Sequence, residues 1–402
     1  MRHDIVLWGA TGFTGQLVAA YLARHEGVGR GLTWALAGRD AAKVAKVREQ
    51  LAEVDPAART LPMILANATD PASMRALAAQ AKVVCTTVGP YARYGAALVD
   101  ACVAEGTHYV DLTGEPTFVH RMIAQHHDEA RRRGVAIVHG CGFDSIPSDL
   151  GCLLVQEHAR RRWGSVLPEV TLYVNKMRGA ASGGTIASMA ELIAEASEDP
   201  AAARVLRDPY SLGGSGPPVN DGAGPAWDAD EGVWTAPFLM AATNARLVRR
   251  SAALLGYDPF RYAERQRFAG NPLGWAGATS VAAALGAGVV VLRAPRVRQV
   301  LLDRVLPAPG TGPSAAARAA GFFEMESVGR GPDGRWVRVT VRGDQDPGYG
   351  ATSGMLAEAA LCLLRSPRPD GVGVVTPAVA LGEPLVARLA RAGVTFEVRE
   401  SA

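Results

Sequence analysis

With 402 residues, the chain is long enough for two domains. Its formal net charge of +3 is nearly neutral for this size, which excludes the strongly basic surface of a nucleic-acid-binding protein. Hydrophobic residues make up 48% of the chain and charged residues 20%, and this balance excludes an intrinsically disordered protein.

Cysteine and histidine usage predicts a cytoplasmic protein without a bound metal. The five cysteines form no C-x-x-C pair, and we expect them to be reduced, buried thiols. The eight histidines form no H-E-x-x-H motif, so no metal site is predicted. The N-terminus leads directly into the first predicted strand, and we expect no signal peptide. The cysteines are Cys85, Cys102, Cys141, Cys152 and Cys362.

The first strand, residues 5–8, ends in a glycine turn that leads into a helix extending to Arg24. The glycines occur as G-x-x-G-x-x-G at Gly9, Gly12 and Gly15. Such a turn needs residues without a Cβ, both for positive φ and for close approach of a pyrophosphate. The helix then offers free N–H groups and its dipole to the phosphates. The pattern predicts a dinucleotide site, with an ordinary strand–turn–helix corner as the alternative.

The second strand, residues 32–39, indicates which dinucleotide is bound. A site that prefers NAD usually ends this strand with an acid that holds the ribose 2′-hydroxyl. Here the strand ends in Arg39, Asp40 comes one place later, and Lys43 follows a helical turn on. A guanidinium suits a 2′-phosphate in charge and in forked geometry. We therefore expect NADP(H), with ordinary solvated charges at Arg39 and Lys43 as the alternative.

Strands and helices alternate as far as residue 145, as in a doubly wound parallel sheet. Asp70 is either a contact to the adenine side of the cofactor or the N-cap of the helix that begins at Pro71. Ligands of open α/β sheets bind outside the carboxyl ends of the strands. The end of the exit loop of the fourth strand, residues 89–91, should therefore lie near the nicotinamide. A later loop, residues 142–149, leaves the same edge of the sheet.

The second region has a different pattern. Its strand-like segments and a hairpin turn at residues 331–334 predict a mixed or antiparallel sheet. A helix is expected over residues 183–196, and a long loop rich in Gly, Pro and Asp is expected over residues 199–234. The strand-like segments are 170–174, 321–328, 336–341 and 394–398.

These patterns predict an α/β protein in three parts. Residues 1–147 form a Rossmann domain that binds NADP, and residues 148–345 form an α/β substrate domain. Residues 346–402 form a C-terminal segment with the last strand and a helix, 355–364, that we expect to return to the Rossmann domain.

Residues 271–292 carry no charged side chain and are flanked by arginines. Their length would allow a membrane span, which needs about 20 apolar residues. The stretch is mostly Gly and Ala, with Pro272 near its start, so its transfer into a membrane is only weakly favourable. We expect a buried helix or the wall of a substrate tunnel, with peripheral lipid contact or a true span as alternatives. The flanking arginines are Arg267, Arg293, Arg296 and Arg298.

Several motifs, in this order, resemble those of the saccharopine-dehydrogenase-like oxidoreductases. They are G-A-T-G-F-T-G, A-G-R, V-G-P-Y-x-x-Y-G, H-Y-V-D-L-T-G-E and G-F-D-S-I-P-S-D-L-G. Two later segments, residues 309–314 and 346–353, resemble the trans-acting enoyl reductases of actinobacterial lipid and polyketide assembly. The resemblance spans nearly the whole chain.

The resemblance implies a Rossmann domain, an α/β substrate domain and the use of NADPH. It also implies an acyl thioester substrate, presented by an acyl carrier protein or a polyketide synthase, with a homodimer as an open alternative. The second region is apolar and lacks the basic cluster that an amino-diacid would need, which fits a long acyl chain. By motif position the cofactor contacts are Gly9, Thr11, Gly12, Phe13, Thr14, Gly15, Arg39, Thr87, Val88, Gly89, Pro90 and Tyr91, to which the strand-end argument adds Lys43 and Asp70.

An enoyl reductase must deliver hydride to the β-carbon, stabilise the enolate oxygen and protonate the α-carbon. Tyr91 and Tyr94 flank the expected nicotinamide edge and could donate a proton or a hydrogen bond, but Tyr91 could equally just pack. Asp144 and Ser145 could hold the thioester or the cofactor amide, with capping of their own loop as the alternative.

Two other functions remain open at this point. The first is reduction of a C=N or C=O bond on the same scaffold. The short-chain-type version of it is disfavoured, because no Y-x-x-x-K motif occurs in the chain. The second is an NADP-binding redox sensor without turnover. A sensor needs no deep apolar cleft at the nicotinamide, whereas a reductase of acyl groups does. Asp111 and Glu115, near a strand end, are a third candidate pair for the chemistry.

Overall fold

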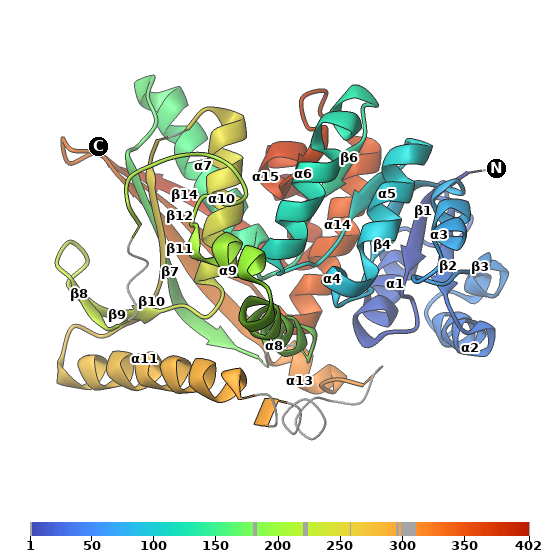
Figure 1. The fold of residues 1–402 in the computed structure, drawn as a ribbon, viewed down its shortest axis with the longest axis horizontal. Helices are drawn as coiled ribbons and strands as arrows, with labels where there is room; N and C mark the ends of the chain where they lie inside the picture. The colour runs from blue at the N-terminus through green and yellow to red at the C-terminus, as the bar shows by residue number, and fades with distance from the viewer. Residues whose placement is uncertain are drawn as a thin grey trace.

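The computed structural model describes residues 2–179, 183–219, 224–257, 259–294, 297–298 and 311–401. Arg296 and the Pro309-Gly310 part of the later motif lie outside these residues. Two seven-stranded sheets make up the described core, and a layer of helices separates them (Figure 1). All five cysteines are buried free thiols, as the sequence predicts.

The first sheet has the order β13-β6-β5-β4-β1-β2-β3, and all its pairs are parallel. Parallel sheets are covered by helices on both faces, so their strands are nearly continuous hydrophobic runs. Ile5, Val6 and Leu7 of β1 show this pattern, because all three are fully buried. The strands are β1 (His3–Trp8), β2 (Trp34–Gly38), β3 (Met63–Leu65), β4 (Ala81–Thr86), β5 (His108–Val110), β6 (Ala136–Val138) and β13 (Gly373–Val375).

The helices between these strands begin at local signals in the sequence. Asp40 caps α2 by accepting a hydrogen bond from the Lys43 N–H, and Asp70 caps α3 by accepting one from the Ala72 N–H. The capping interpretation of Asp70 is therefore confirmed. The helical segments of this domain are α1 (Phe13–His25), α2 (Ala41–Leu51), η1 (Pro56–Thr60), α3 (Pro71–Ala78), α4 (Tyr91–Tyr94), α5 (Ala96–Glu105) and α6 (Pro116–Arg132).

The second sheet has the order β14-β12-β11-β7-β10-β9-β8 and is mixed, because β10 runs parallel to β7 while the other pairs are antiparallel. β11 and β12 form the hairpin predicted at residues 331–334, where Gly334 has a φ of +85°. The strands are β7 (Glu169–Arg178), β8 (Ala226–Asp228), β9 (Val233–Pro237), β10 (Arg261–Phe268), β11 (Phe322–Arg330), β12 (Trp336–Gly343) and β14 (Val394–Glu400).

The helices of the second region lie in two places. α7 (Ile146–Trp163) and α10 (Ala241–Leu255) pack on the inner face of the second sheet, towards the first sheet (Figure 1). α8 (Gly183–Glu198) and α9 (Pro200–Arg207) lie across the gap between the two halves, and α11 (Pro272–Arg293) runs along the lower edge. The expected loop over 199–234 is wrong at both ends. Asp199 caps α9 by accepting from the Ala201 N–H, and β8 and the start of β9 lie within the last part of the expected loop.

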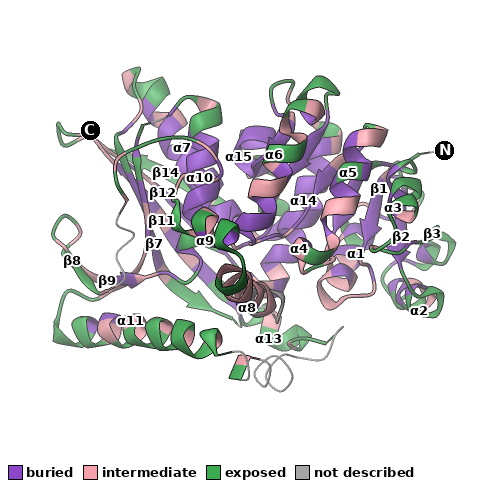
Figure 2. Ribbon diagram, viewed as in Figure 1, coloured by how far each residue is buried: buried purple, intermediate pink, exposed green. Residues whose placement is uncertain are grey.

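α11 is not the buried helix that the sequence analysis favours. Only Gly274 and Ala278 of this helix are buried, and its outer side is exposed along its length (Figure 2). The helix is long and apolar enough to cross a membrane by length and composition. Its inner side contacts β9, β10 and α8.

The C-terminal segment contributes to both sheets. α14 (Thr352–Arg365) is buried over residues 352–363 and contacts α1, β4 and β5, so the helix does return to the first sheet. β13 then joins β6 in the first sheet, and β14 joins β12 in the second. The remaining short helices are α13 (Ala315–Ala319), η2 (Pro347–Ala351), α15 (Pro377–Ala380), α16 (Gly382–Leu389) and η3 (Ala390–Ala392).

A buried carboxylate fixes α14 in place. The Glu358 side chain is 0% exposed. It accepts a hydrogen bond from the Tyr21 hydroxyl at 2.8 Å and forms an ion pair with Arg388 at 2.7 Å. A carboxylate without solvent needs such partners, and losing one side of the pair leaves the other charge uncompensated. Glu358 therefore links α14 to α1 and α16.

We predict that Glu358→Ala lowers the free energy of unfolding by about 3 kcal/mol, because Arg388 and Tyr21 lose their shared partner. The urea denaturation midpoint measures this change. Glu383→Ala is the matched control, since its ion pair with Arg161 is about half exposed on both sides and should cost less than about 1 kcal/mol. Equal midpoints for the two variants would contradict the assignment.

Candidate functional site

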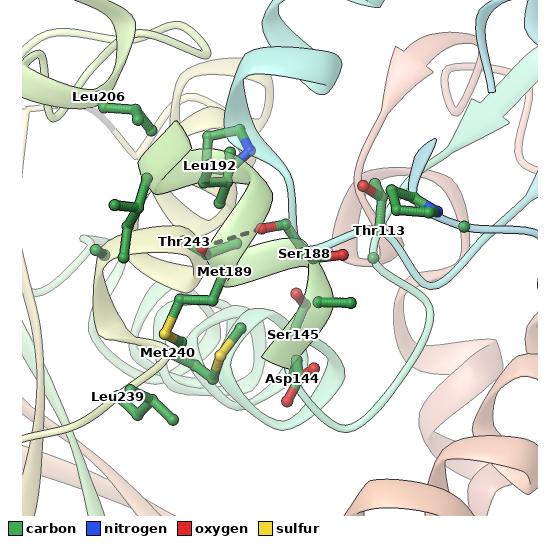
Figure 3. A pocket seen from close by; sticks show the side chains of 18 of the residues that line it. Thr113, Asp144, Ser145, Ser188, Met189, Leu192, Leu206, Leu239, Met240 and Thr243 are labelled. Atoms are coloured by element: carbon green, nitrogen blue, oxygen red, sulfur yellow. Dashed lines mark hydrogen bonds between the residues drawn. The ribbon is translucent and has the colours of Figure 1, made fainter. Parts of the chain in front are cut away.

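A cavity of about 950 Å³ lies between the carboxyl edge of the first sheet and the helices of the second region. It is lined by the start of α1, by the loops that follow β4, β5 and β6, and by α8, α10 and α11 (Figure 3). Its size is that of a typical site for a small-molecule ligand. The prediction that the 271–292 helix forms a tunnel wall is consistent with this lining, which includes Leu285, Gly288 and Leu292.

One end of the cavity reaches the glycine turn. Gly9 has a φ of +90°, and a Cβ there would lie 2.7 Å from both Thr87 Oγ1 and Val88 Cγ2. A Cβ on Gly15 would lie 2.1 Å from the Gly9 carbonyl oxygen, so α1 can approach the turn only without that side chain. These contacts explain the glycines at both ends of the motif.

The start of α1 has the free amides that a phosphate requires. Gly12 is the N-cap residue of α1, and no side chain caps this helix. The first-turn N–H groups have no partner within the helix, so they point towards the space beyond its end. Thr14 lines the cavity. The turn therefore fits a pyrophosphate, with the positive end of the helix dipole behind it. The first-turn residues are Phe13, Thr14 and Gly15, and Thr11 lies in the turn itself.

The end of β2 lies beside this turn. The Gly9 and Ala10 N–H groups donate to the Ala37 carbonyl at 3.1 and 3.2 Å. Arg39, which follows β2, is exposed and forms no ion pair within the described residues, and Lys43 is also exposed. Asp40 is already used as the cap of α2. Two cations and no unengaged acid therefore stand where a ribose 2′-substituent would lie, which suits a phosphate.

The exit loop of β4 forms the next part of the cavity wall. Thr87 donates from Oγ1 to the Gly9 carbonyl at 3.2 Å, and its N–H donates to the Trp8 carbonyl at 3.0 Å. The Val88 N–H is held by Thr86 Oγ1 at 3.2 Å. These bonds fasten the loop to the glycine turn. Thr87, Gly89, Pro90 and Tyr91 all line the cavity, in the place where sequence analysis expects the nicotinamide.

The two candidate tyrosines have different surroundings. Tyr91 is 5% exposed. Its hydroxyl donates to the Thr86 carbonyl and accepts from the Leu112 N–H, each at 3.2 Å. Burial raises the pKa of the Tyr91 hydroxyl well above its ordinary value. The hydroxyl thus uses its hydrogen and one of its lone pairs in bonds to the backbone. This favours the interpretation that Tyr91 packs beside the cavity and does not donate a proton. Tyr94 is half-buried and is not among the residues that line the cavity.

Asp144 and Ser145 lie together on the cavity wall, close to Met189 and Met240 (Figure 3). Ser145 is the N-cap residue of α7 but makes no side-chain cap. Its hydroxyl donates instead to Asn244 Oδ1 at 3.5 Å, a long bond that leaves the hydroxyl free to rotate at little cost. Of the four candidate catalytic residues, Asp144 and Ser145 are therefore the best placed to meet a ligand.

A buried carboxylate holds together the loops that carry these residues. Asp111 is 0% exposed. Its Oδ1 accepts from the Thr113 and Gly140 N–H groups at 3.0 Å each, and its Oδ2 accepts from the Tyr109 hydroxyl at 2.9 Å. His139 Nδ1 lies 2.7 Å from the same Oδ2. Asp111 thus serves to fix the loops after β5 and β6.

Glu115, the other acid of the third candidate pair, plays a similar part for the β4 loop. It accepts hydrogen bonds from the Tyr91 and Ala92 N–H groups at 3.0 and 2.7 Å, and from the Ser188 hydroxyl at 2.8 Å. Burial raises the pKa of the Glu115 carboxyl, while these donors oppose the rise. The carboxylate therefore ties α4 to α8 across the edge of the cavity.

Most of the far wall is apolar, and sequence analysis did not identify its residues. Their positions depend on how α8, α9, α10 and α11 pack, for which the local sequence has no signal. Two exposed arginines, Arg207 and Arg293, also line the cavity, and neither forms an ion pair within the described residues. The large apolar residues are Met189, Leu192, Ile193, Leu206, Phe238, Leu239, Met240, Leu285, Val289 and Leu292.

One hydroxyl on the near side was also missed. Thr113 Oγ1 accepts from the Glu115 N–H at 3.2 Å, so its own hydrogen can point into the cavity that it lines. The signal that could have found it is its place in the H-Y-V-D-L-T-G-E motif, two residues after Asp111.

Comparison with known proteins defines the class of the site. Residues 5–138 match the family model of the saccharopine dehydrogenase NADP binding domain. Apo saccharopine dehydrogenase (L-Glu forming) from Saccharomyces cerevisiae shares the fold, with a TM-score of 0.55 over 100% of both chains at 14% identity. The first domain is therefore an NADP(H)-binding domain, and the protein is an oxidoreductase with a saccharopine-dehydrogenase-like fold.

Closer relatives narrow the family. The trans-acting enoyl reductase of Mycobacterium leprae is 39% identical in an alignment 416 positions long, which covers 98% of this chain and 97% of that protein. A Mycobacterium tuberculosis protein that carries the same name provisionally is 44% identical in an alignment 422 positions long, with the same coverage. The chain belongs to the family of these trans-acting enoyl reductases.

We predict that Arg39→Ala weakens NADPH binding by about tenfold to a hundredfold, because a charge-assisted contact to the 2′-phosphate is lost. NADH binding should stay within about twofold, since NADH has no such phosphate. Isothermal titration with each nucleotide measures both. Lys46→Ala, at an exposed position of α2 further from the turn, is the control. An equal loss for both nucleotides would refute a 2′-phosphate contact.

We also predict that Gly9→Ala abolishes NADPH binding, because its Cβ would collide with Thr87 and Val88 and displace the β4 loop. Gly29→Ala separates this effect from backbone strain, since Gly29 also has a positive φ, +71°, but has nothing within 4 Å of its added Cβ. Gly29→Ala should lose about 1 kcal/mol of stability through its positive φ, and Gly9→Ala should lose more because of the added collision, whereas only Gly9→Ala should lose the nucleotide. Fluorescence titration with NADPH distinguishes them.

Proposed function

We propose that this protein is an NADPH-dependent enoyl reductase that reduces the C=C bond of an α,β-unsaturated acyl thioester. The observation that carries the proposal is one continuous cavity, which runs from the open amides of α1, past the β4 loop, to the apolar wall of α8, α10 and α11. The family names of its relatives support the same reaction. A redox sensor would not need this apolar space beyond the nicotinamide end.

When bound, NADPH supplies the hydride that adds to the β-carbon of the substrate. The glycine turn and the amides of α1 fit its pyrophosphate, and Arg39 and Lys43 fit its 2′-phosphate. The loop of residues 87–91 then bounds the space for the nicotinamide. The contribution of the protein is to hold the two reacting carbons at the right distance and orientation.

The negative charge that develops on the thioester oxygen needs hydrogen-bond donors. Thr113 and Ser145 carry the hydroxyls best suited to this role, because each lines the cavity and has a hydrogen able to turn towards a ligand. They belong to two loops that Asp111 fixes relative to each other. Asp144 lies next to Ser145 and is our candidate for the proton that reaches the α-carbon.

Two features of the cavity favour an acyl thioester over an amino-diacid. The far wall is built from Leu, Ile, Val, Met and Phe side chains, which suit a hydrocarbon chain. Arg207 and Arg293 line the same cavity and suit a phosphate, as in coenzyme A or the phosphopantetheine arm of a carrier protein. Reduction of a C=N or C=O bond is the second candidate, favoured only by the shared saccharopine-dehydrogenase-like fold.

The direct test is NADPH consumption with a medium-chain α,β-unsaturated acyl thioester of coenzyme A, with mass spectrometry of the product. We expect the product to gain two hydrogens at the C=C bond, because hydride and proton add to adjacent carbons. A panel of imines and ketones of similar size serves as the control. Consumption with that panel, and none with the enoyl thioester, would overturn the proposal in favour of the second candidate.

We predict that Ser145→Ala lowers kcat by about tenfold to a hundredfold with little change in NADPH affinity, because a donor to the thioester oxygen is lost. Tyr91→Phe should keep kcat within about threefold and lose about 1 kcal/mol of stability, since its hydroxyl bonds to the backbone of Thr86 and Leu112. Steady-state kinetics and a thermal melt check both. The reverse pattern of kcat values would identify Tyr91 as the catalytic residue.

A further inference from the structure

α11 has two faces, and one of them has no partner within the described residues. The inner residues recur every three or four positions, at 274, 278, 281, 285, 288 and 292, and are the less exposed ones. This face contacts β9, β10 and α8 and lines the cavity. The outer face holds Leu273, which is 83% exposed, and Val290, which is 67% exposed. Ala283 lies between them on that face and is also exposed.

The outer face is unusual for a surface in contact with water. Residues 271–292 contain no Asp, Glu, Lys or Arg. Trp275 is 49% exposed near the start of the helix, and Val291 is 42% exposed near its end. A solvated helix normally carries charged residues on its outer side. Contiguous exposed apolar surface of this length marks a contact with another apolar phase.

Positive charge is concentrated at the C-terminal end of the helix. Arg293 is exposed and forms no ion pair within the described residues. Arg298 donates to the Leu292 carbonyl at 3.5 Å, which places its guanidinium at the same end. Arg267, near the N-terminal end, instead forms ion pairs with Glu231 and Glu326, which neutralise its charge. An apolar face that ends in arginines with no ion pair in the part of the chain that the structure describes is complementary to a bilayer with anionic headgroups.

We propose that α11 docks this protein on an anionic lipid bilayer, lying in the plane of the interface. The helix is one wall of the protein and is held to it along its inner face, which contacts β9, β10 and α8. Crossing the bilayer would require the helix to leave the cavity that it lines. Lying flat, it keeps those contacts and immerses only its outer face, with Trp275 suited to the headgroup region.

Docking on a bilayer also indicates which substrates reach the cavity. This second step rests on the proposed enoyl reductase function. The same helix separates the cavity from the bilayer, since Leu285, Gly288 and Leu292 face the cavity while Val290 faces outward. A substrate whose long acyl chain partitions into the lipid is therefore concentrated beside the cavity in which its thioester reaches Ser145. The substrate class is an enoyl thioester with a chain long enough to partition into a membrane.

The test is flotation of the full-length protein with vesicles of phosphatidylcholine, with and without phosphatidylglycerol. We expect binding to the anionic vesicles, and a loss of about tenfold or more in the triple variant Leu273→Glu, Ala283→Glu and Val290→Glu, none of which lines the cavity. The control, Val54→Glu, Leu254→Glu and Val398→Glu, adds the same charge at exposed apolar positions away from α11, which are 37%, 39% and 37% exposed. It should bind like the wild type.

Two further measurements, the oligomeric state and the turnover of a soluble substrate, distinguish lipid docking from a protein interface and from a failure of the proposed function. If the wild type does not bind vesicles and the α11 variant changes a dimer into a monomer in light scattering, the face is an interface between two copies and the proposal is overturned. Turnover of a soluble short-chain enoyl thioester should be the same in both triple variants. A different result would separate docking from function. If neither the wild type nor either triple variant reduces that substrate, but only the α11 variant loses vesicle binding, the docking proposal is supported and the proposed enoyl reductase function is overturned.

Discussion

The geometry of the site depends on one carboxylate that never meets solvent. Asp111 receives hydrogen bonds from the backbone of two separate loops, and these loops carry Thr113 on one side and Ser145 on the other. A buried charge of this kind is tolerated only when several donors compensate for the lost water. The same requirement removes the freedom of the loops, because any shift would leave the carboxylate unpaired. The two hydroxyls are thus held in place before a ligand arrives, which is what stabilisation of a developing charge requires.

The first half of the fold was predictable because its signals are local. The apolar run before Gly9, the glycine spacing, and the Asp-Pro helix starts each act within a few residues. Strand β10 was missed for the opposite reason. Half of its eight residues are charged and do not alternate with apolar ones, and Arg267 and Glu264 are stabilised there by Glu231 and Asn244, which lie 36 and 20 positions away in sequence. A charged strand interior becomes favourable only when such partners are in place.

The same distinction applies to the candidate site. The cofactor end follows from backbone geometry, which sequence encodes directly through glycine and strand ends. The substrate end is assembled from α8, α10 and α11, whose residues meet only through tertiary packing. Tyr91 shows how this affects individual residues: its motif position places it correctly beside the cavity, but only the structure shows that its hydroxyl is bonded to Thr86 and Leu112. Asp70, similarly, is a helix cap whichever contacts it makes to the cofactor.

The route of the last sixty or so residues also constrains how the chain folds as it is synthesised. β13 is the edge strand of the first sheet and β14 the edge strand of the second, while α14 fills the core between β4 and α1. The first sheet is not complete until residue 375 has left the ribosome, and the second is not complete until residue 400 has done so. The nucleotide-binding half is synthesised first, but one face of its sheet stays uncovered until α14 has been synthesised and packs on β4 and β5. The closing contacts join residues hundreds of positions apart, as Tyr21 and Glu358 do, so the two halves should lock together late and as one unit.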